Sequence, residues 1–265
     1  MKREVSKVEK ALTALRAMHS GSGKAPIGTP ALLIVTLVYL GLMLSVAPEA
    51  LARLLWFALY PIVMAPVVGE QYGRVFVRSL AVLPFVILIG IFNPLYQTEV
   101  AFRIGSVTIS RGWVTFMSIL VRALLSVQAL LLLVDSVGFA GLCSGLRRIG
   151  VPALLTTQLM MVYRYMTVLL QESLDMTRAR QARGYRGRNM SLSMWGTYCG
   201  QLFLRTVARS ERIHRAMLAR GFNGSMPVLA AGEVWNRRDT VTLVAVTCVF
   251  ALFRWGPLPA LFAFG

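Results

Sequence analysis

The sequence predicts an all-α integral membrane protein with about five transmembrane helices and a long basic helical region between the fourth and the last span. Of its 265 residues, 56% are hydrophobic and only 15% are charged, whereas soluble domains carry about 25% charged residues. The apolar residues also form long uninterrupted blocks, which a water-soluble surface would not tolerate. Both observations are explained by embedding in a bilayer.

The predicted spans follow from blocks that approach the roughly 20 apolar residues needed to cross a bilayer core. Prolines inside them are tolerated where neighbouring groups satisfy the freed backbone. The expected spans are residues 30–47, 54–68, 79–95, 113–134 and 240–253. The expected segments are a basic N-terminal segment (1–29), a four-span bundle (30–135), a basic helical region (136–239) and a last span (240–265).

The charge distribution predicts the orientation. The chain has 28 Lys and Arg against 11 Asp and Glu, and most arginines lie between Arg147 and Arg238. Basic segments that flank spans mark the cytoplasmic side, so both the N-terminus and the 136–239 region are expected there. Nucleic acid is not an expected partner, because no DNA- or RNA-binding motif accompanies the charge.

Two shorter stretches predict further elements. Residues 97–112 alternate apolar and polar side chains, as expected of a short external hairpin. Its Arg103 and Arg111 run against the chosen orientation, but the arginines after Ser136 outweigh them. Residues 152–170 and 194–204 are apolar but short or interrupted by charge, so helices at the cytoplasmic interface are favoured over a sixth and seventh span.

A ten-residue pattern occurs twice in the basic region, at residues 178–187 and 215–224. Both copies fit Arg-Ala-x-x-Ala-Arg-Gly-aromatic-x-Gly, so seven of ten positions agree. Ala and Arg favour helix, and the glycine supplies the left-handed conformation that ends one. The arginine before it is expected in the last turn, where it presents a guanidinium able to grip a carboxylate. The sequence therefore predicts two equivalent helix tips and a partner with two equivalent sockets.

The helix before the second copy has a basic stripe with apolar residues opposite. Topology or attraction to anionic lipid would explain the stripe alone, but neither explains the duplicated tips. The stripe is Arg205, Arg209, Arg212 and Arg220, and the broadly opposite residues are Phe203, Val207, Met217 and Leu218.

These residues resemble the T component of energy-coupling factor transporters, most closely its cobalt/nickel branch, the CbiQ type. The resemblance lies in Tyr163-Arg164-Tyr165, in Glu172, in the two tips, and in the entry to the last span at residues 235–239. It implies the transmembrane coupling subunit of an ABC-type importer for cobalt or nickel in a bacterial inner membrane. Two ATP-binding subunits would each receive one tip, and a separate membrane subunit would bind the substrate.

The resemblance assigns roles residue by residue. The 136–239 region would form coupling helices. No cofactor is expected, and two distant histidines with methionines at helical spacing do not predict a metal site. The docking residues would be Ala182, Arg183, Gly184, Ala219, Arg220 and Gly221, supported by Arg178, Tyr185, Arg215 and Phe222.

Other function classes fit less well. A membrane enzyme would need converging catalytic groups, but the chain offers only Asp135, Glu172, Asp175 and two histidines. Glu172 and Asp175 are expected to pair with Arg178 or Arg164 instead. A permease subunit of another ABC-type transporter and a vitamin-type T component remain open alternatives, although an ordinary permease would present one docking helix per chain.

Overall fold

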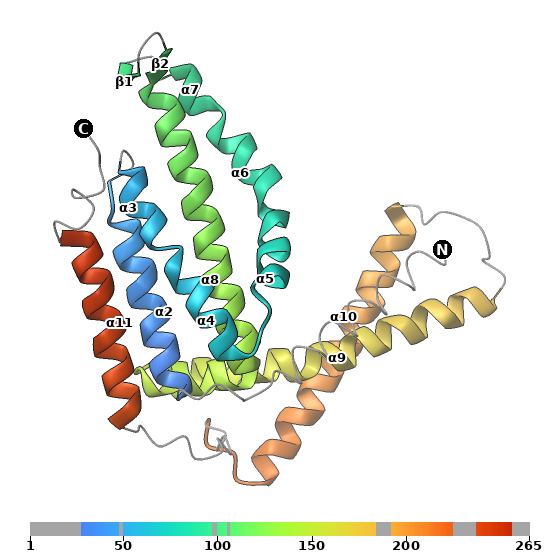
Figure 1. Cartoon of the computed structure of the whole chain (residues 1–265). Coiled ribbons are helices and arrows are strands. Elements are labelled where there is room, and N and C mark those ends of the chain that lie inside the picture. Colours follow the sequence, from blue (N-terminus) through green and yellow to red (C-terminus); the bar gives the residue numbers. More distant parts are fainter. Residues whose placement is uncertain are drawn as a thin grey trace. The chain divides into compact units, whose positions relative to one another are not determined.

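The computed structural model describes residues 28–47, 50–96, 100–104, 107–183, 192–224 and 237–255. Among these residues, every regular element other than one hairpin is a helix (Figure 1), which confirms the all-α membrane fold. The chain divides into two compact units, one formed by residues 1–20 with 139–230 and the other by residues 21–138 with 231–265. The two units are described separately.

The bundle unit contains α2 to α7, the hairpin, the first part of α8, and α11. The other unit, called here the α9–α10 pair, contains the remainder of α8 together with α9 and α10. The bounds are α2 Thr29–Leu44, α3 Leu51–Trp56, α4 Leu59–Val68, α5 Tyr72–Ser79, η1 Leu80–Val82, α6 Leu83–Gly90, α7 Phe92–Tyr96, β1 Val100–Ile104, β2 Val107–Ser110, α8 Arg111–Arg148, α9 Ala153–Ala182, α10 Leu192–Ala219 and α11 Arg237–Trp255.

The predicted spans all coincide with helical segments, but two are divided. The second is split into α3 and α4 by a turn at residues 57–58, and the third is a run of short helices from α5 to α7. By length and composition, Tyr72–Pro94, Arg111–Arg148 and Ala153–Arg180 could each cross a membrane, whereas α2 and Arg53–Val68 are shorter apolar helices. Helix α9, expected at the interface, is therefore also apolar and long enough to span.

The predicted hairpin is present. Strands β1 and β2 pair antiparallel, with Arg103 opposite Thr108 and Ile104 opposite Val107. The alternation seen in the sequence is the period of two that a strand requires.

An aromatic cluster joins α2 to the α3–α4 segment and to α11. Tyr39 stacks on Tyr60 with ring centroids 4.2 Å apart, and Phe250 meets Tyr39 edge-on at 5.3 Å. The Tyr39 hydroxyl donates to the Phe57 carbonyl at 3.0 Å. Because buried hydroxyls need a partner, this bond fixes the position of the turn between α3 and α4.

Helices α2 and α11 run in the same direction (Figure 1). At their starts the Gly28 amide donates to Asp239 Oδ1 at 3.0 Å, and at their ends Arg254 donates to the Ser45 carbonyl at 3.0 Å. Both helices therefore begin on the same side of the bundle. Between residues 28 and 239 the chain must therefore cross the membrane an even number of times. If the four spans before α9 all cross, α9 and α10 together also contribute an even number of crossings.

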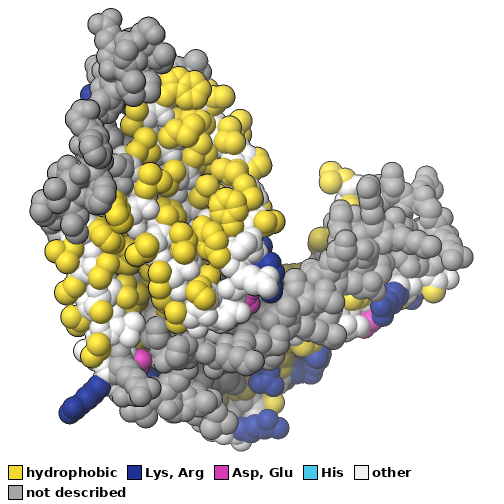
Figure 2. Space-filling view, viewed as in Figure 1, with side chains coloured by type: hydrophobic (Ala, Val, Ile, Leu, Met, Phe, Trp, Pro, Cys, Tyr) yellow, Lys and Arg dark blue, Asp and Glu magenta, His cyan; other side chains and the backbone are white. Residues whose placement is uncertain are grey.

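The outer face of the bundle is apolar (Figure 2). Val77, Phe85 and Leu88 are 67%, 65% and 65% exposed. Exposed apolar patches of this extent are not tolerated in water, so this surface fits contact with lipid. The multi-pass membrane character of the chain follows.

Candidate functional site

Helices α9 and α10 are antiparallel and are held together by polar contacts. Near the end of α9 and the start of α10, an Arg180 nitrogen lies 3.1 Å from Met194 Sδ. Further along, the Tyr198 hydroxyl donates to the Ser173 carbonyl at 2.7 Å. The Glu172 carboxylate then receives Arg205 at 2.5 Å. Residues nearer the start of α9 thus lie beside residues nearer the end of α10. The C-terminal end of α9 is therefore far from the C-terminal end of α10.

The second tip has the geometry of a Schellman motif. Helix α10 ends at Ala219, and Gly221 has φ of +78°. The Phe222 amide donates to the Met217 carbonyl and the Gly221 amide to the Leu218 carbonyl, each at 3.0 Å. These are the two bonds that define the motif, and a left-handed residue is required between them. The left-handed conformation predicted for Gly221 is confirmed.

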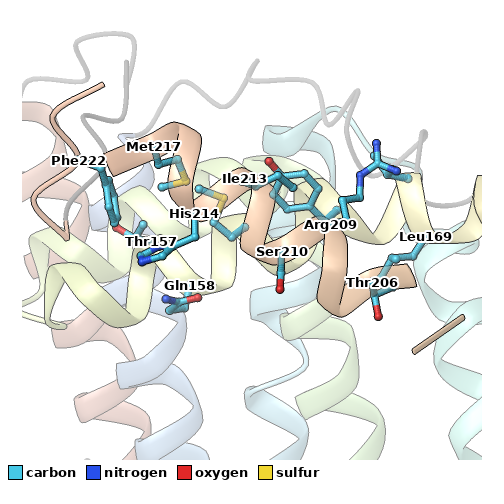
Figure 3. Close-up of a pocket in the computed structure, with 13 residues that line it drawn as sticks. Thr157, Gln158, Leu169, Thr206, Arg209, Ser210, Ile213, His214, Met217 and Phe222 are labelled. Atoms are coloured by element: carbon cyan, nitrogen blue, oxygen red, sulfur yellow. The ribbon is translucent and has the colours of Figure 1, made fainter. Parts of the chain in front are cut away.

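The aromatic residue of the second tip anchors the helix end. Phe222 and Met217 line a cavity of about 300 Å³ between α9 and α10 (Figure 3). An apolar contact between these two positions commonly accompanies a Schellman motif. Gly221 and Phe222 therefore have a structural function, because they end α10 and fix its tip. Arg220, which stands just before them, is exposed.

The first tip is described in part. Helix α9 ends at Ala182, and Arg183 follows in a turn whose amide donates to the Arg180 carbonyl at 3.2 Å. Gly184 and Tyr185 lie outside the described residues. Arg183 and Arg220 each lie one residue beyond the last helical residue, so their expected place in the last turn was wrong by one position.

The tip arginines differ from the other arginines of the repeat. Arg178 lies 3.8 Å from Asp175, and Arg215 lies 3.4 Å from Glu211, so each pairs within its own helix. Arg183 and Arg220 are exposed, and no carboxylate among the described residues pairs with either of them. An exposed guanidinium held at a rigid helix end is available for an acidic or polar partner.

Two expectations about charge need correction. Glu172 pairs with Arg205 of α10 and not with Arg178 or Arg164, while the expected pairing of Asp175 with Arg178 is confirmed. Arg205 therefore belongs to the contact between the helices and is not a freely presented member of the basic stripe. A helical wheel drawn for one helix cannot reveal a partner on another.

The apolar residues predicted opposite the stripe divide into two groups. Phe203, Val207 and Leu218 are exposed at 65%, 39% and 52%. Met217 instead faces α9 across the cavity (Figure 3), so it was wrongly grouped with them. On α9, a row of exposed residues at helical spacing adds a second apolar stripe: Leu155, Leu159, Val162 and Met166.

The candidate catalytic carboxylates do not converge. Asp135 accepts a hydrogen bond from Arg78 at 2.7 Å within the bundle, whereas Glu172 and Asp175 each pair with an arginine of the α9–α10 pair. The part of the chain that the structure describes contains no group of three or more His, Cys, Asp or Glu side chains placed to hold a metal ion. His214 lies on the wall of the cavity.

Several structural residues were not identified from the sequence. Asp239 caps the start of α2 from a distance of 211 positions, and Tyr198 joins α10 to α9. An aspartate at the start of an apolar helix is a recognisable first-turn residue. Its partner could not be found without the fold.

Comparison with known proteins identifies the family. The CbiQ family model, described as a cobalt transport protein, matches residues 29–229. Cobalt transport protein CbiQ of Rhodobacter capsulatus is 36% identical over 92 residues, which are 34% of this chain and 38% of that protein. The Salmonella typhimurium protein of the same name is 32% identical over 93 residues, 35% and 41% of the two chains.

An uncharacterized protein of Methanocaldococcus jannaschii is 31% identical over 120 residues, covering 43% of this chain and 41% of the other. The matched segments thus span about two fifths of each of these curated relatives, between 38% and 41% of their length. The family match is broader, because it covers most of the bundle and the whole α9–α10 pair. The chain belongs to the CbiQ family of cobalt transport proteins.

Proposed function

We propose that this chain is the transmembrane coupling subunit of an energy-coupling factor importer for cobalt. Two ATP-hydrolysing subunits dock on its two tips from the cytoplasm, and a separate membrane subunit binds the ion. The chain lies in the bacterial inner membrane with its N-terminal segment and its tips on the cytoplasmic side. Cobalt is proposed as the cargo because the matching family and two of the relatives are described as cobalt transport proteins.

The observation that carries the proposal is the placement of the two tips. The first tip lies beside the start of α10 and the second at its end, and a 28-residue helix is about 40 Å long. Each tip presents an exposed arginine without a carboxylate partner among the described residues. Two similar sites at this separation fit two copies, or two relatives, of one globular partner better than a single small partner.

The surfaces beside the tips support the remaining interactions. The stripe formed by Leu155, Leu159, Val162 and Met166 is apolar and exposed, and such a surface suits a membrane subunit or lipid. Movement of the ATPase subunits would pull the two tips, and the α9–α10 pair would pass that movement to the substrate-binding subunit. The role of this chain is mechanical, and the hydrolysis belongs to its partners.

The test is ATP-driven uptake of radioactive Co²⁺ by liposomes that contain this chain with its ATPase and substrate-binding subunits. Replacing both Arg183→Glu and Arg220→Glu should abolish uptake and release the ATPase subunits. Uptake that survives the double reversal contradicts the proposal.

A matched control separates docking from bulk positive charge. Arg164→Glu with Arg212→Glu makes the same change in net charge at two exposed positions, one on α9 and one on α10, without altering a tip or the cavity that holds Phe222. We expect this control to keep most of its uptake. If it loses as much as the tip variant, the basic surface acts through lipid attraction or topology, and the tips have no special part.

A further inference from the structure

Gly138 interrupts α8 with a backbone conformation that only glycine adopts readily. Its dihedral angles are φ 67° and ψ 170°, and it is the one non-helical residue inside the 38-residue helix. A side chain at these angles would clash with the backbone, so the region is essentially restricted to glycine. One residue thus separates two helical segments that would otherwise form a single rod.

The segment before Gly138 is fixed to the bundle. Asp135 accepts a hydrogen bond from Arg78 of α5 at 2.7 Å, and the Gln128 amide group donates to the Ser79 hydroxyl at 3.3 Å. Gln128 is only 2% exposed. Two polar contacts to neighbouring residues of α5, of which the one from Gln128 is buried, hold this part of α8 against α5.

The segment after Gly138 is fixed to α9. The next residue, Phe139, stacks on Tyr163 with ring centroids 4.3 Å apart and planes inclined by 16°. The two compact units of the chain also divide between Gly138 and Phe139. Within α8 both flanks are thus anchored, each to its own unit, and Gly138 is the one residue between them with non-helical dihedral angles.

We infer that Gly138 is the hinge about which the α9–α10 pair turns relative to the bundle. This inference rests on the proposed function for its purpose: when the tips are pulled, the α9–α10 pair tilts as one body and the bundle keeps its place in the membrane. Hinges are single positions that absorb a change in φ and ψ. A glycine between two anchored helical segments meets that requirement.

The hinge is tested by electron-spin distance measurements on the full chain in lipid nanodiscs. Spin labels at Val77→Cys and Leu192→Cys, which are 67% and 90% exposed, report the distance between the units. The native thiols are removed first by replacing Cys143, Cys199 and Cys248. We expect a broad or two-peaked distance distribution with Gly138, and a single narrow peak in Gly138→Ala.

The controls show whether a change is specific to the hinge. Gly141→Ala lies in the same helix with ordinary helical dihedrals, so it should leave the distribution broad. A label pair within the bundle, Leu37→Cys with Leu252→Cys, should stay narrow in every variant and shows that each variant is folded. If the protein that retains Gly138 already gives a narrow distribution of inter-unit distances, Gly138 is a fixed kink. That result overturns the inference without any variant.

Transport provides the second readout. In the reconstituted importer, Gly138→Ala should still bind its ATPase subunits and hydrolyse ATP, but Co²⁺ uptake should fall about tenfold, as expected from loss of a typical coupling free energy. Unchanged uptake overturns the hinge. If the ATPase subunits fail to bind even the unaltered chain, the proposed function fails, and the distance measurement still decides whether Gly138 is a hinge.

Discussion

The bundle and the α9–α10 pair use the same kinds of polar contact in opposite surroundings. In the bundle, Asp239 is 4% exposed, while Val77 and Phe85 face outward at 67% and 65%. In the α9–α10 pair, the side chains of Glu172 and Arg205 are 29% and 59% exposed. The difference is one of burial: the carboxylate at the start of α2 is shielded from its surroundings, whereas the ion pair between α9 and α10 is partly exposed. Equivalent contacts should therefore have unequal energies in the two units.

The largest effect is expected at the buried carboxylate. Asp239→Ala leaves the buried start of α2 with an unsatisfied Gly28 amide, so the free energy of unfolding should fall by about 1–3 kcal/mol. Denaturant titration in detergent measures this change. The matched control is Asp175→Ala, whose carboxylate is 59% exposed and should matter by less than about 0.5 kcal/mol. Equal effects at the two positions would contradict the comparison.

The second effect concerns two glycines of the α9–α10 pair. Gly221→Ala forces a side chain into the conformation at φ +78° and should destabilise the second tip by about 1–2 kcal/mol. Gly196→Ala lies within α10, where the position that a Cβ would occupy is open space, so it should stabilise the helix by about 1 kcal/mol. Amide hydrogen exchange along α10 measures both. If both substitutions change the stability of α10 in the same direction, the result contradicts a Schellman motif at the end of this helix.

A smaller effect is expected where α9 and α10 meet. Tyr198→Phe removes the hydroxyl that donates to the Ser173 carbonyl at 2.7 Å, and the loss should be about 1 kcal/mol. Thermal unfolding followed by circular dichroism would register it. No loss of stability would mean that the contact between the helices is apolar in character.

The smallest effect is expected from the exposed ion pair. Glu172→Gln weakens the contact with Arg205, yet both side chains remain partly in water, so the cost should be below about 1 kcal/mol and should shrink at high salt. Stability measured at low and high ionic strength tests this. A cost as large as that of Asp239→Ala would place this pair in an apolar setting and remove the contrast between the units.

Local features were predictable from the sequence because they depend on neighbouring residues. The apolar blocks located the spans, the alternation located the hairpin, and the repeated glycine located the end of α10 at Gly221. The breaks within the second and third spans were not predicted, since their turns depend on contacts such as the Tyr39 hydroxyl with the Phe57 carbonyl.

Contacts between distant segments could not be predicted in the same way. The partner of Glu172 lies 33 positions away and that of Asp239 lies 211 positions away. A pattern on one helix identifies which side chains share a face, but not which helix covers that face. The docking role proposed for Arg183 and Arg220 is a further case, because the partners that it requires would belong to other chains.

The central claim is that each tip holds one ATPase subunit, and native mass spectrometry of the nucleotide-free complex tests it most directly. We expect two ATPase subunits on the unaltered chain, one on Arg183→Glu or Arg220→Glu alone, and none on the double variant. Two ATPase subunits retained by the double variant would contradict the claim.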